Sequence, residues 1–373
     1  MKAKLWIAGY IFILALMLGG IGKTVYDVDP FFHYHKPNTD QYFYTLDNQR
    51  SQNNGICKNF DYDALISGTS MTENFSTTEM DQIFGTNSIK VSYSGASYKE
   101  INDSIELALA YNPSLKTVVR GLDMKKFFDA SDFMVTNLGK FPTYLYDENP
   151  FNDVQYLFNR DILFERTYEM IKATDTWGFE PGITSFDDYS NWQKDWVFGI
   201  NAVAKEGVNT VITGEEKHLT DEEKSGIYDN IYQNVGSIAE KNKDVTFYYF
   251  FTPYSALWWE EQLETGNIYR QIEAEQYVIE ILLQYENIKL FSFNMRTDIT
   301  TNINNYRDTT HYGEWVNSLI LKWMHSGNYQ LTADNYIPYL EDELQFYCSF
   351  DYESLNEQED YEDDYYAATL VNQ

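Results

Sequence analysis

The chain has 373 residues, with 57 acidic and 27 basic side chains, and its formal net charge at pH 7 is −30. This excess of negative charge argues against nucleic acid as a partner and against a face that lies on anionic lipid. Behind the first 23 residues about 350 remain, which is enough for one large domain with insertions or for two domains.

The first predicted element is a membrane-targeting segment at residues 1–23. An uncharged run of 18 mostly aliphatic and aromatic residues, from Leu5 to Gly22, follows two lysines. This length is the lower limit for a membrane-spanning helix, and the basic front end favours a cytoplasmic N-terminus. A cleaved signal peptide is the alternative, although residues 18–22 match a small-x-small cleavage site poorly. We expect a single-pass protein of the cell membrane with its main domain outside the cytoplasm.

An irregular, polar juxtamembrane neck is predicted for residues 24–60. His33 and His35 are spaced so that a strand would place both on one face, but no third metal ligand is evident nearby. We therefore expect packing in this neck, no metal, and no nucleotide or redox cofactor. Cys57 and Cys348 are the only cysteines. They could form one disulfide in an exported domain, and free buried thiols fit equally well.

Residues 61–340 alternate between short apolar runs and segments with helical spacing. This alternation predicts an α/β domain in three layers, with a parallel flavodoxin-like sheet and helices on both faces. The expected strands are 61–67, 89–93, 115–119, 245–251 and 288–293, and the expected helices are 72–84, 98–111, 220–241, 268–285 and 312–324.

Two stretches depart from this alternation. Residues 124–205 are rich in aromatic side chains and irregular, which indicates an insertion or cap. Residues 341–373 contain eleven Asp or Glu residues and no Lys or Arg. We interpret this stretch as a solvated, largely disordered acidic tail, with a cation-binding or partner-binding tail as the alternative.

Candidate catalytic residues follow two of the expected strands. Ser70 ends the run Ala64–Ser70, and Asp308-Thr309-Thr310-His311 lies just ahead of the last expected helix. Ligands of open α/β sheets gather at the carboxyl ends of the strands, where both motifs are expected. A serine nucleophile needs an imidazole to accept its proton and a carboxylate to orient that imidazole. The sequence therefore predicts Ser70, His311 and Asp308 as nucleophile, base and orienting group.

These short motifs resemble those of the SGNH/GDSL hydrolases. Gly68-Thr69-Ser70 is similar to the nucleophile block of that family, and Asp308-x-x-His311 is similar to its closing block. Ser92-Tyr93-Ser94-Gly95 lies where the family has the glycine whose amide contributes to the oxyanion hole. The resemblance implies the SGNH type of fold and a serine esterase or acyltransferase activity.

The chain departs from that family at two positions. Thr69 replaces the usual aspartate before the nucleophile, and Asp123 in Gly121-Leu122-Asp123 replaces an asparagine that donates to the oxyanion. An ionised carboxylate would repel this oxyanion. Asp123 is then protonated, or points elsewhere, or the hole is built differently. Its alternative donors are the backbone amides of Ser70 or Met71 and of Gly95, with the side chain of Asn74 or Arg120.

A substrate could contact further side chains near these motifs. Asp123 and Arg120 follow the same expected strand, and Tyr254 and Trp258, with Trp259 next to it, follow the strand 245–251. Aromatic rings stack on sugar faces, although they more often fill a core. We expect Asp123, Arg120, Tyr254 and Trp258 to line the substrate.

A tethered SGNH-like domain with Gly-x-Ser resembles the D-alanyl-lipoteichoic acid export protein DltD and the SGNH-like polysaccharide O-acetyltransferases. This resemblance implies acyl transfer to a cell-surface polysaccharide or teichoic-acid-like polymer, beside a membrane-bound O-acyltransferase. A tether supports such a partnership, because two proteins in one membrane meet at high effective concentration. Removal of acetyl groups by a carbohydrate esterase is one alternative. A non-catalytic scaffold that binds the polymer is another.

Overall fold

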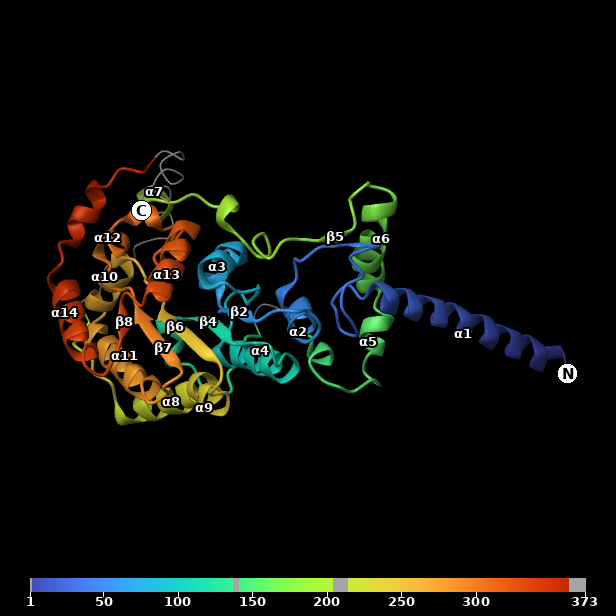
Figure 1. Ribbon diagram of the computed structural model, residues 1–373, viewed down its shortest axis with the longest axis horizontal. Coiled ribbons are helices and arrows are strands. Elements are labelled where there is room, and N and C mark those ends of the chain that lie inside the picture. The colour runs from blue at the N-terminus through green and yellow to red at the C-terminus, as the bar shows by residue number, and fades with distance from the viewer. Residues whose placement is uncertain (1, 137–140, 204–213, 362–373) are drawn as a thin grey trace. The chain divides into compact units, whose positions relative to one another are not determined.

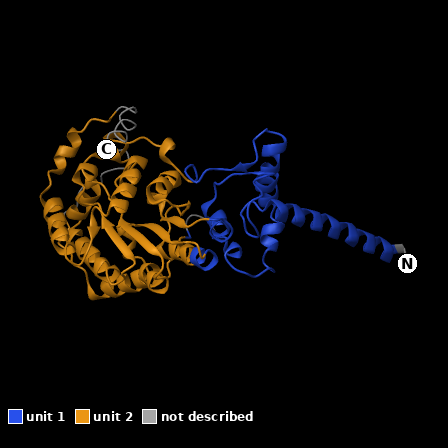
Figure 2. Ribbon diagram, viewed as in Figure 1, with its two compact units in different colours: residues 1–61, 107–112, 136–189 blue, residues 62–106, 113–135, 190–373 orange. Residues whose placement is uncertain are grey.

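The computed structural model of the protein describes residues 2–136, 141–203 and 214–361. These residues form two compact units (Figure 2). Unit 1 consists of residues 1–61, 107–112 and 136–189, and unit 2 consists of residues 62–106, 113–135 and 190–373.

Unit 2 contains a six-stranded sheet, which confirms the prediction of an α/β protein with a mostly parallel sheet. The strand order is β3-β2-β4-β6-β7-β8, and β8 alone pairs antiparallel with its neighbour. The strands are β2 (Ala64–Gly68), β3 (Ser88–Ser92), β4 (Thr117–Leu122), β6 (Thr246–Phe251), β7 (Ile288–Ser292) and β8 (Gln330–Leu331). Every residue of β2 and β3 is buried. Burial on both faces explains why β2 is a nearly continuous apolar run. β3 alternates instead, and its buried Lys90 donates to the backbone carbonyls of Glu73 and Phe75.

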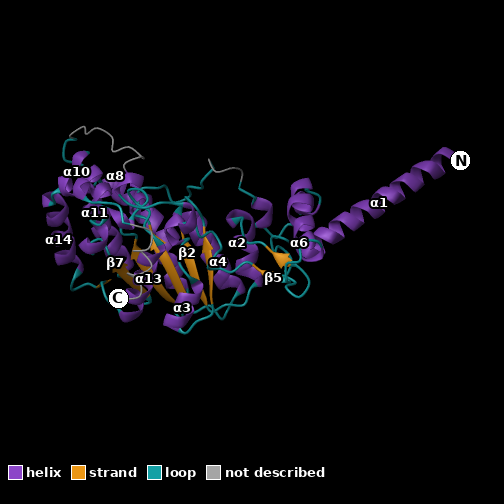
Figure 3. Cartoon of the chain, turned by 90° about the horizontal axis from the view of Figure 1, so that it is seen from above, coloured by secondary structure: helices purple, strands orange, loops and turns teal. Residues whose placement is uncertain are grey.

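Helices cover both faces of this sheet (Figure 3). α3 and α13 pack together on one face, and α8 and α11 pack together on the other (Figures 1 and 3). The helices of unit 2 are α3 (Thr77–Phe84), α4 (Tyr98–Tyr111, whose last turn belongs to unit 1), α7 (Ile200–Val203), α8 (Asp221–Ile231), α9 (Ser237–Lys241), α10 (Ala256–Glu264), α11 (Ile268–Leu282), α12 (Thr297–Thr300), α13 (Glu314–Ser326) and α14 (Tyr336–Ser349).

The helix after β2 starts later than predicted. A short 3-10 turn, Ser70–Thr72, comes first, and α3 begins at Thr77 behind its N-cap Ser76, whose side chain accepts from the backbone N–H of Glu79. Gly85 ends α3 in the left-handed conformation, with φ 69°. A glycine adopts this conformation without the steric strain of a Cβ. The helix therefore ends at Phe84, the predicted end.

The predicted acidic tail is partly helical, which corrects our expectation. Residues 341–349 continue α14, where Leu340, Glu343 and Tyr347 are buried, and a 3-10 segment follows at Tyr352–Glu357. One buried side chain per turn holds this helix against the rest of unit 2, so its exposed acidic face misled the sequence analysis. Residues 362–373, the remainder of that tail, lie outside the described part of the chain.

Unit 1 begins with the long apolar helix α1 (Lys2–Val28). By length and composition, its residues 3–28 could cross a membrane, as an anchor or as a signal sequence. The rest of unit 1 contains α2 (Gln49–Asn59), α5 (Val154–Leu157), a π-helical turn (Ile162–Thr167), α6 (Tyr168–Asp175) and a parallel pair of two-residue strands, β1 (Phe43–Tyr44) and β5 (Gly182–Ile183).

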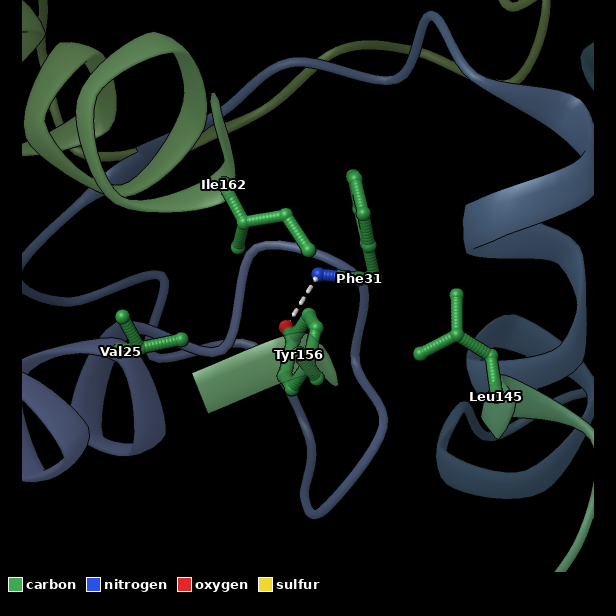
Figure 4. Close-up of a cluster of buried hydrophobic side chains, with 5 residues drawn as sticks. All are labelled: Val25, Phe31, Leu145, Tyr156 and Ile162. Atoms are coloured by element: carbon green, nitrogen blue, oxygen red, sulfur yellow. Dashed lines mark hydrogen bonds between the residues drawn. The ribbon is translucent and has the colours of Figure 1, made fainter. Parts of the chain in front are cut away.

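The end of α1 is part of the core of unit 1. Val25 packs in a buried cluster with Phe31, Leu145, Tyr156 and Ile162 (Figure 4). The hydroxyl of Tyr156 also accepts a hydrogen bond from the backbone N–H of Phe31, at 3.1 Å. The last turns of α1 are therefore fixed in the folded unit.

Helix α2 occupies part of the neck that we predicted to be irregular. Its Gln52 and Asn53 are buried, because Gln52 donates to the carbonyls of Pro30 and Thr45 and Asn53 accepts from the hydroxyl of Tyr189. Polar side chains make up half of the buried residues of this helix, beside Gly55, Ile56 and Cys57, so hydrophobic periodicity did not reveal it. The two cysteines, Cys57 buried and Cys348 exposed, are not joined by a disulfide.

Candidate active site

Ser70 lies at the carboxyl end of β2, where the chain turns sharply. A Cβ at Gly68 would lie 2.6 Å from a methyl carbon of Thr72, so only glycine allows this close approach. Thr69 then caps the 3-10 turn, because its hydroxyl accepts from the backbone N–H of Met71 at 3.3 Å. The turn holds Ser70 half-buried, just past the strand.

The structure brings Ser70 and His311 together although they are 241 positions apart. Ser70 Oγ lies 2.7 Å from His311 Nε2. His311 Nδ1 lies 2.7 Å from Asp308 Oδ2. His311 keeps 23% of its side chain exposed, so the pair can be reached from solvent. This hydroxyl, imidazole and carboxylate form a relay with the geometry of a serine nucleophile and its base.

The loop around Asp308 explains the spacing of Asp-x-x-His. Asp308 Oδ1 accepts hydrogen bonds from the backbone N–H groups of Thr310 and His311, at 2.8 and 2.7 Å, which leaves Oδ2 for the imidazole. Burial opposes ionisation of Asp308, but the hydrogen bonds from His311 and Thr310 outweigh it and hold the pKa of this carboxyl well below its usual range. Asp308 is therefore a carboxylate at neutral pH.

Trp192 contacts both the candidate nucleophile and the candidate base, which the sequence analysis did not predict. Its indole Nε1–H donates to the carbonyl of Ser70 at 3.2 Å, and its ring meets His311 edge-on, with centroids 5.7 Å apart. The neighbouring Gln193 accepts from the backbone N–H of Glu314 and so joins this segment to the start of α13. The sequence holds no local signal for these contacts, because they join an irregular segment to distant loops.

Arg307 completes the surroundings of Asp308. Its Nε donates to Asp308 Oδ2 at 3.1 Å, and its guanidinium lies 3.7 Å from the ring centroid of Trp196 and 4.9 Å from that of Trp192. A guanidinium can stack on aromatic rings while it donates in its own plane. Arg307 therefore links the carboxylate to the aromatic segment, a role that the sequence analysis also missed.

Asn74 presents an unused donor close to Ser70. Its Oδ1 accepts from the backbone N–H of Trp192 at 3.1 Å. Its Nδ2 is buried and has no hydrogen-bond partner among the described residues. A buried amide without a partner is costly unless a ligand or water satisfies it. Asn74 Nδ2 is thus a donor that no described residue uses.

The other expected oxyanion donors differ in availability. The backbone N–H of Met71 already donates to Thr69 Oγ1. Gly95 lies in the exposed turn after β3, with φ 65°, which glycine adopts without strain. Among the described residues, no hydrogen bond joins Gly95 to Ser70.

Asp123 is held by hydroxyl groups. Its two carboxyl oxygens accept hydrogen bonds from Thr69 Oγ1 and from Tyr254, the latter at 2.8 Å. Tyr98 donates to its backbone carbonyl at 2.9 Å. Burial, together with the charge of Asp123, raises the pKa of Tyr254 well above its usual value, so this tyrosine stays a neutral donor. Of the three alternatives that we considered for Asp123, the structure agrees with the one in which its carboxyl group points at partners other than the oxyanion.

The four residues expected to line the substrate are buried, which differs from our expectation. Arg120, Tyr254 and Trp258 are at most 2% exposed, and Asp123 is 6% exposed. Arg120 donates to the carbonyls of Asn234, at 2.7 Å, and Tyr98, at 3.4 Å. Its guanidinium also lies over the rings of Tyr98 and Tyr249. These contacts hold Arg120 within the fold, so it is not the donor near Ser70 that we considered.

No group of three metal-ligating side chains occurs among the described residues. His33 Nε2 contacts Asp153 at 3.3 Å, and both ring nitrogens of His35 face backbone carbonyls, those of Lys36 and Tyr26. These histidines thus make packing contacts within unit 1.

No protein-family model matches the chain, and no curated protein matches its sequence. Among solved structures, a protein from Streptococcus pneumonia, provisionally named a platelet activating factor, aligns with 75% of this chain and 90% of its own, at 10% sequence identity and a TM-score of 0.35. A score this low does not establish a common fold.

Proposed function

We propose that the protein is a membrane-tethered serine acyl-ester enzyme of the SGNH type that acts outside the cytoplasm. Its substrate would be a cell-surface polysaccharide or teichoic-acid-like polymer. The observation that carries this proposal is the relay from Ser70 Oγ through His311 to Asp308, with both separations at 2.7 Å. An ionised Asp308 favours the imidazole tautomer that presents an unprotonated Nε2 to the serine hydroxyl.

The reaction would proceed in two steps through an ester on Ser70. Ser70 Oγ attacks the acyl carbonyl carbon while His311 Nε2 takes the hydroxyl proton. The tetrahedral intermediate expels the donor alcohol, which receives that proton from His311. An acceptor hydroxyl then loses its proton to His311 and attacks the acyl carbon, and Ser70 regains a proton as it leaves. The acyl group is an acetyl or alanyl group in our proposal.

Asn74 supports a remodelled oxyanion hole in this proposal. The family's asparagine is replaced by Asp123, whose carboxyl is engaged by Thr69 and Tyr254. Asn74 Nδ2 is a buried donor without a partner among the described residues, and the Trp192 backbone joins Asn74 to the indole that contacts Ser70. We assign the oxyanion to Asn74 Nδ2 with the backbone amides of Ser70 and Gly95.

The sheet topology supports the SGNH type. Counted from β2 as the first strand, the five parallel strands have the order 2-1-3-4-5, which is the flavodoxin-like order. Ser70 follows β2 and Asp123 follows β4, the two strands between which the chain order reverses. Ligands of this kind of sheet bind at that point.

The proposed tether is α1, and a membrane-bound O-acyltransferase is the proposed partner. Such a partner would supply the acyl donor at high effective concentration in the same membrane. If water reaches the acyl-enzyme before the polymer does, the same residues perform hydrolysis, and the protein is a carbohydrate esterase. Access of water therefore separates the two activities.

The test measures both activities on the full chain in detergent. Release of p-nitrophenol from its acetyl ester reports acylation of Ser70, and mass spectrometry of an added glycan reports transfer. We expect Ser70→Ala to abolish release, while Ser326→Ala, an exposed serine at the end of α13, leaves it unchanged. Unchanged release with Ser70→Ala contradicts the proposal and favours a non-catalytic scaffold. Release without glycan modification favours the esterase.

A further inference from the structure

Unit 1 has a concentration of exposed apolar side chains. Outside α1, seven large hydrophobic residues of the described chain are at least half exposed, and six of them belong to unit 1 although it is the smaller unit. Phe179 of these six packs on Phe43, and Lys172 lies over Trp177. Phe151, 87% exposed, is the most extreme. Apolar surface that gathers in one region indicates an interaction site rather than random exposure.

Three of these six residues lie on the short segment 151–164, together with Phe158, which is 44% exposed. We call Phe151, Val154, Phe158 and Phe164 the apolar collar. Phe151, Val154 and Phe158 follow one another at spacings of three and four residues, and α5 (Val154–Leu157) lies among them. Of the three, Val154 lies in α5, Phe151 lies in the turn before it, and Phe158 is its C-cap. Phe164 belongs to the π-helical turn that follows.

This segment packs against α1 where its uncharged run ends. Both α5 and the π-helical turn contact α1, and α5 lies beside the last turns of α1 in Figure 1. A Cβ at Gly22 would be 3.4 Å from the ring of Phe158. From Val25 onward α1 is part of the folded unit. The collar therefore lies at the level where a membrane-spanning α1 would leave the hydrocarbon layer.

We propose that the apolar collar inserts into the bilayer interface around the base of α1. Aromatic and large apolar side chains at this depth bury part of their surface against acyl chains. A protein with a net charge of −30 would be repelled by anionic lipid. The collar residues carry no charge, so the surface suits zwitterionic headgroups. This inference depends on α1 remaining uncleaved, and it does not depend on the chemistry at Ser70.

The test places a fluorophore on the collar in the full chain. Burial raises the pKa of the Cys57 thiol to about 12, so this cysteine resists labelling, and Cys348→Ser removes the exposed one. Phe151→Cys and Phe164→Cys then provide collar positions for an environment-sensitive dye. Tyr111→Cys is the control: Tyr111 is exposed and lies at the end of α4, in the segment 107–112 of unit 1.

Each labelled chain is reconstituted into phosphatidylcholine nanodiscs with or without a lipid that carries a nitroxide quencher near the headgroup. We expect quenching at both collar positions to exceed that at Tyr111→Cys by about twofold or more. Equal quenching at all three positions would overturn the proposal. So would blue-shifted emission at the collar without quenching by lipid, which indicates burial against protein. The quenching experiment does not involve the chemistry at Ser70, so its result is independent of whether Ser70→Ala loses nitrophenyl ester cleavage.

Discussion

Thr69 donates a hydrogen bond from its Oγ1 to Asp123 Oδ2, and these are the two positions at which the chain departs from the SGNH motifs. The two departures are therefore coupled in space although 54 residues separate them. The same threonine hydroxyl accepts from the backbone N–H of Met71. Asp123 thus fixes the turn that carries Ser70.

Asp123→Ala should destabilise the fold, because it leaves the buried hydroxyls of Thr69 and Tyr254 without their acceptor. We expect a loss of about 1–3 kcal/mol in the free energy of unfolding. Asp123→Asn keeps an acceptor oxygen and should lose less. Denaturant unfolding of both variants measures the difference, and equal stability of Asp123→Ala and the parent chain would refute the coupling.

Asn74→Asp tests the proposed oxyanion donor. An aspartate can still accept from the backbone N–H of Trp192, as Asn74 Oδ1 does. It replaces the free amide donor with a carboxylate that repels the oxyanion. We expect kcat for ester cleavage to fall about 10²–10³-fold, with little change in KM. Asn328→Asp, on the exposed surface after α13, is the control. An unchanged kcat in Asn74→Asp would assign the oxyanion to other donors.

Trp192→Phe removes the indole donor to the Ser70 carbonyl and keeps a ring against His311. A hydrogen bond of this kind contributes about 1 kcal/mol, so kcat should fall about fivefold. The melting temperature should change little, because the phenyl ring fills most of the same space. A large loss of stability with an unaltered kcat would make Trp192 a packing residue only.

The buried Glu275 and Glu343 predict a pH dependence of stability. Burial raises the pKa of Glu343 from an ordinary 4.5 to about 8, and Glu275 shifts in the same direction. The folded state therefore holds a proton that the unfolded chain releases above its ordinary pKa. Stability is greatest below pH 4.5 as far as this group is concerned, and it is lost as the pH rises through 8.

Glu343→Gln should flatten this dependence and should stabilise the protein most at pH 8 to 9. Glu341→Gln, an exposed position on the same helix, should leave it unchanged. Thermal unfolding at several pH values between 5 and 9 provides the measurement. A parent chain whose stability does not fall across this range would contradict a protonated Glu343.

The sequence allowed prediction of the five parallel strands of unit 2 and of the meeting of Ser70 with His311, but not of the antiparallel edge strand β8. Buried parallel strands are continuous apolar runs, as β2 and β6 illustrate, and their order along the chain indicates the sheet. Residues that follow such strands share one edge of the sheet. In the structure Ser70 Oγ lies 2.7 Å from His311 Nε2, as expected. The catalytic roles of these residues stay predictions.

Other features could not be predicted because their partners are distant in the sequence. Trp192 belongs to an irregular segment, and its contacts with Ser70 and His311 follow from how loops fold together. Arg120 was expected at the site because it follows the same expected strand as Asp123. The structure buries it between two tyrosine rings and two backbone carbonyls. These contacts compensate for the burial of the Arg120 charge. Because they involve residues distant in the sequence, no local sequence pattern predicts them.

The most direct test of the account is the covalent state of Ser70. The full chain is incubated with an activated acetyl or alanyl ester, quenched in acid and digested, and the peptide that contains Ser70 is analysed by mass spectrometry. We predict an acyl adduct on Ser70 that is absent from Ser70→Ala and strongly reduced in His311→Ala. Ester cleavage that proceeds in the parent chain without any adduct on Ser70, or an adduct that forms equally well in His311→Ala, would contradict the proposed relay.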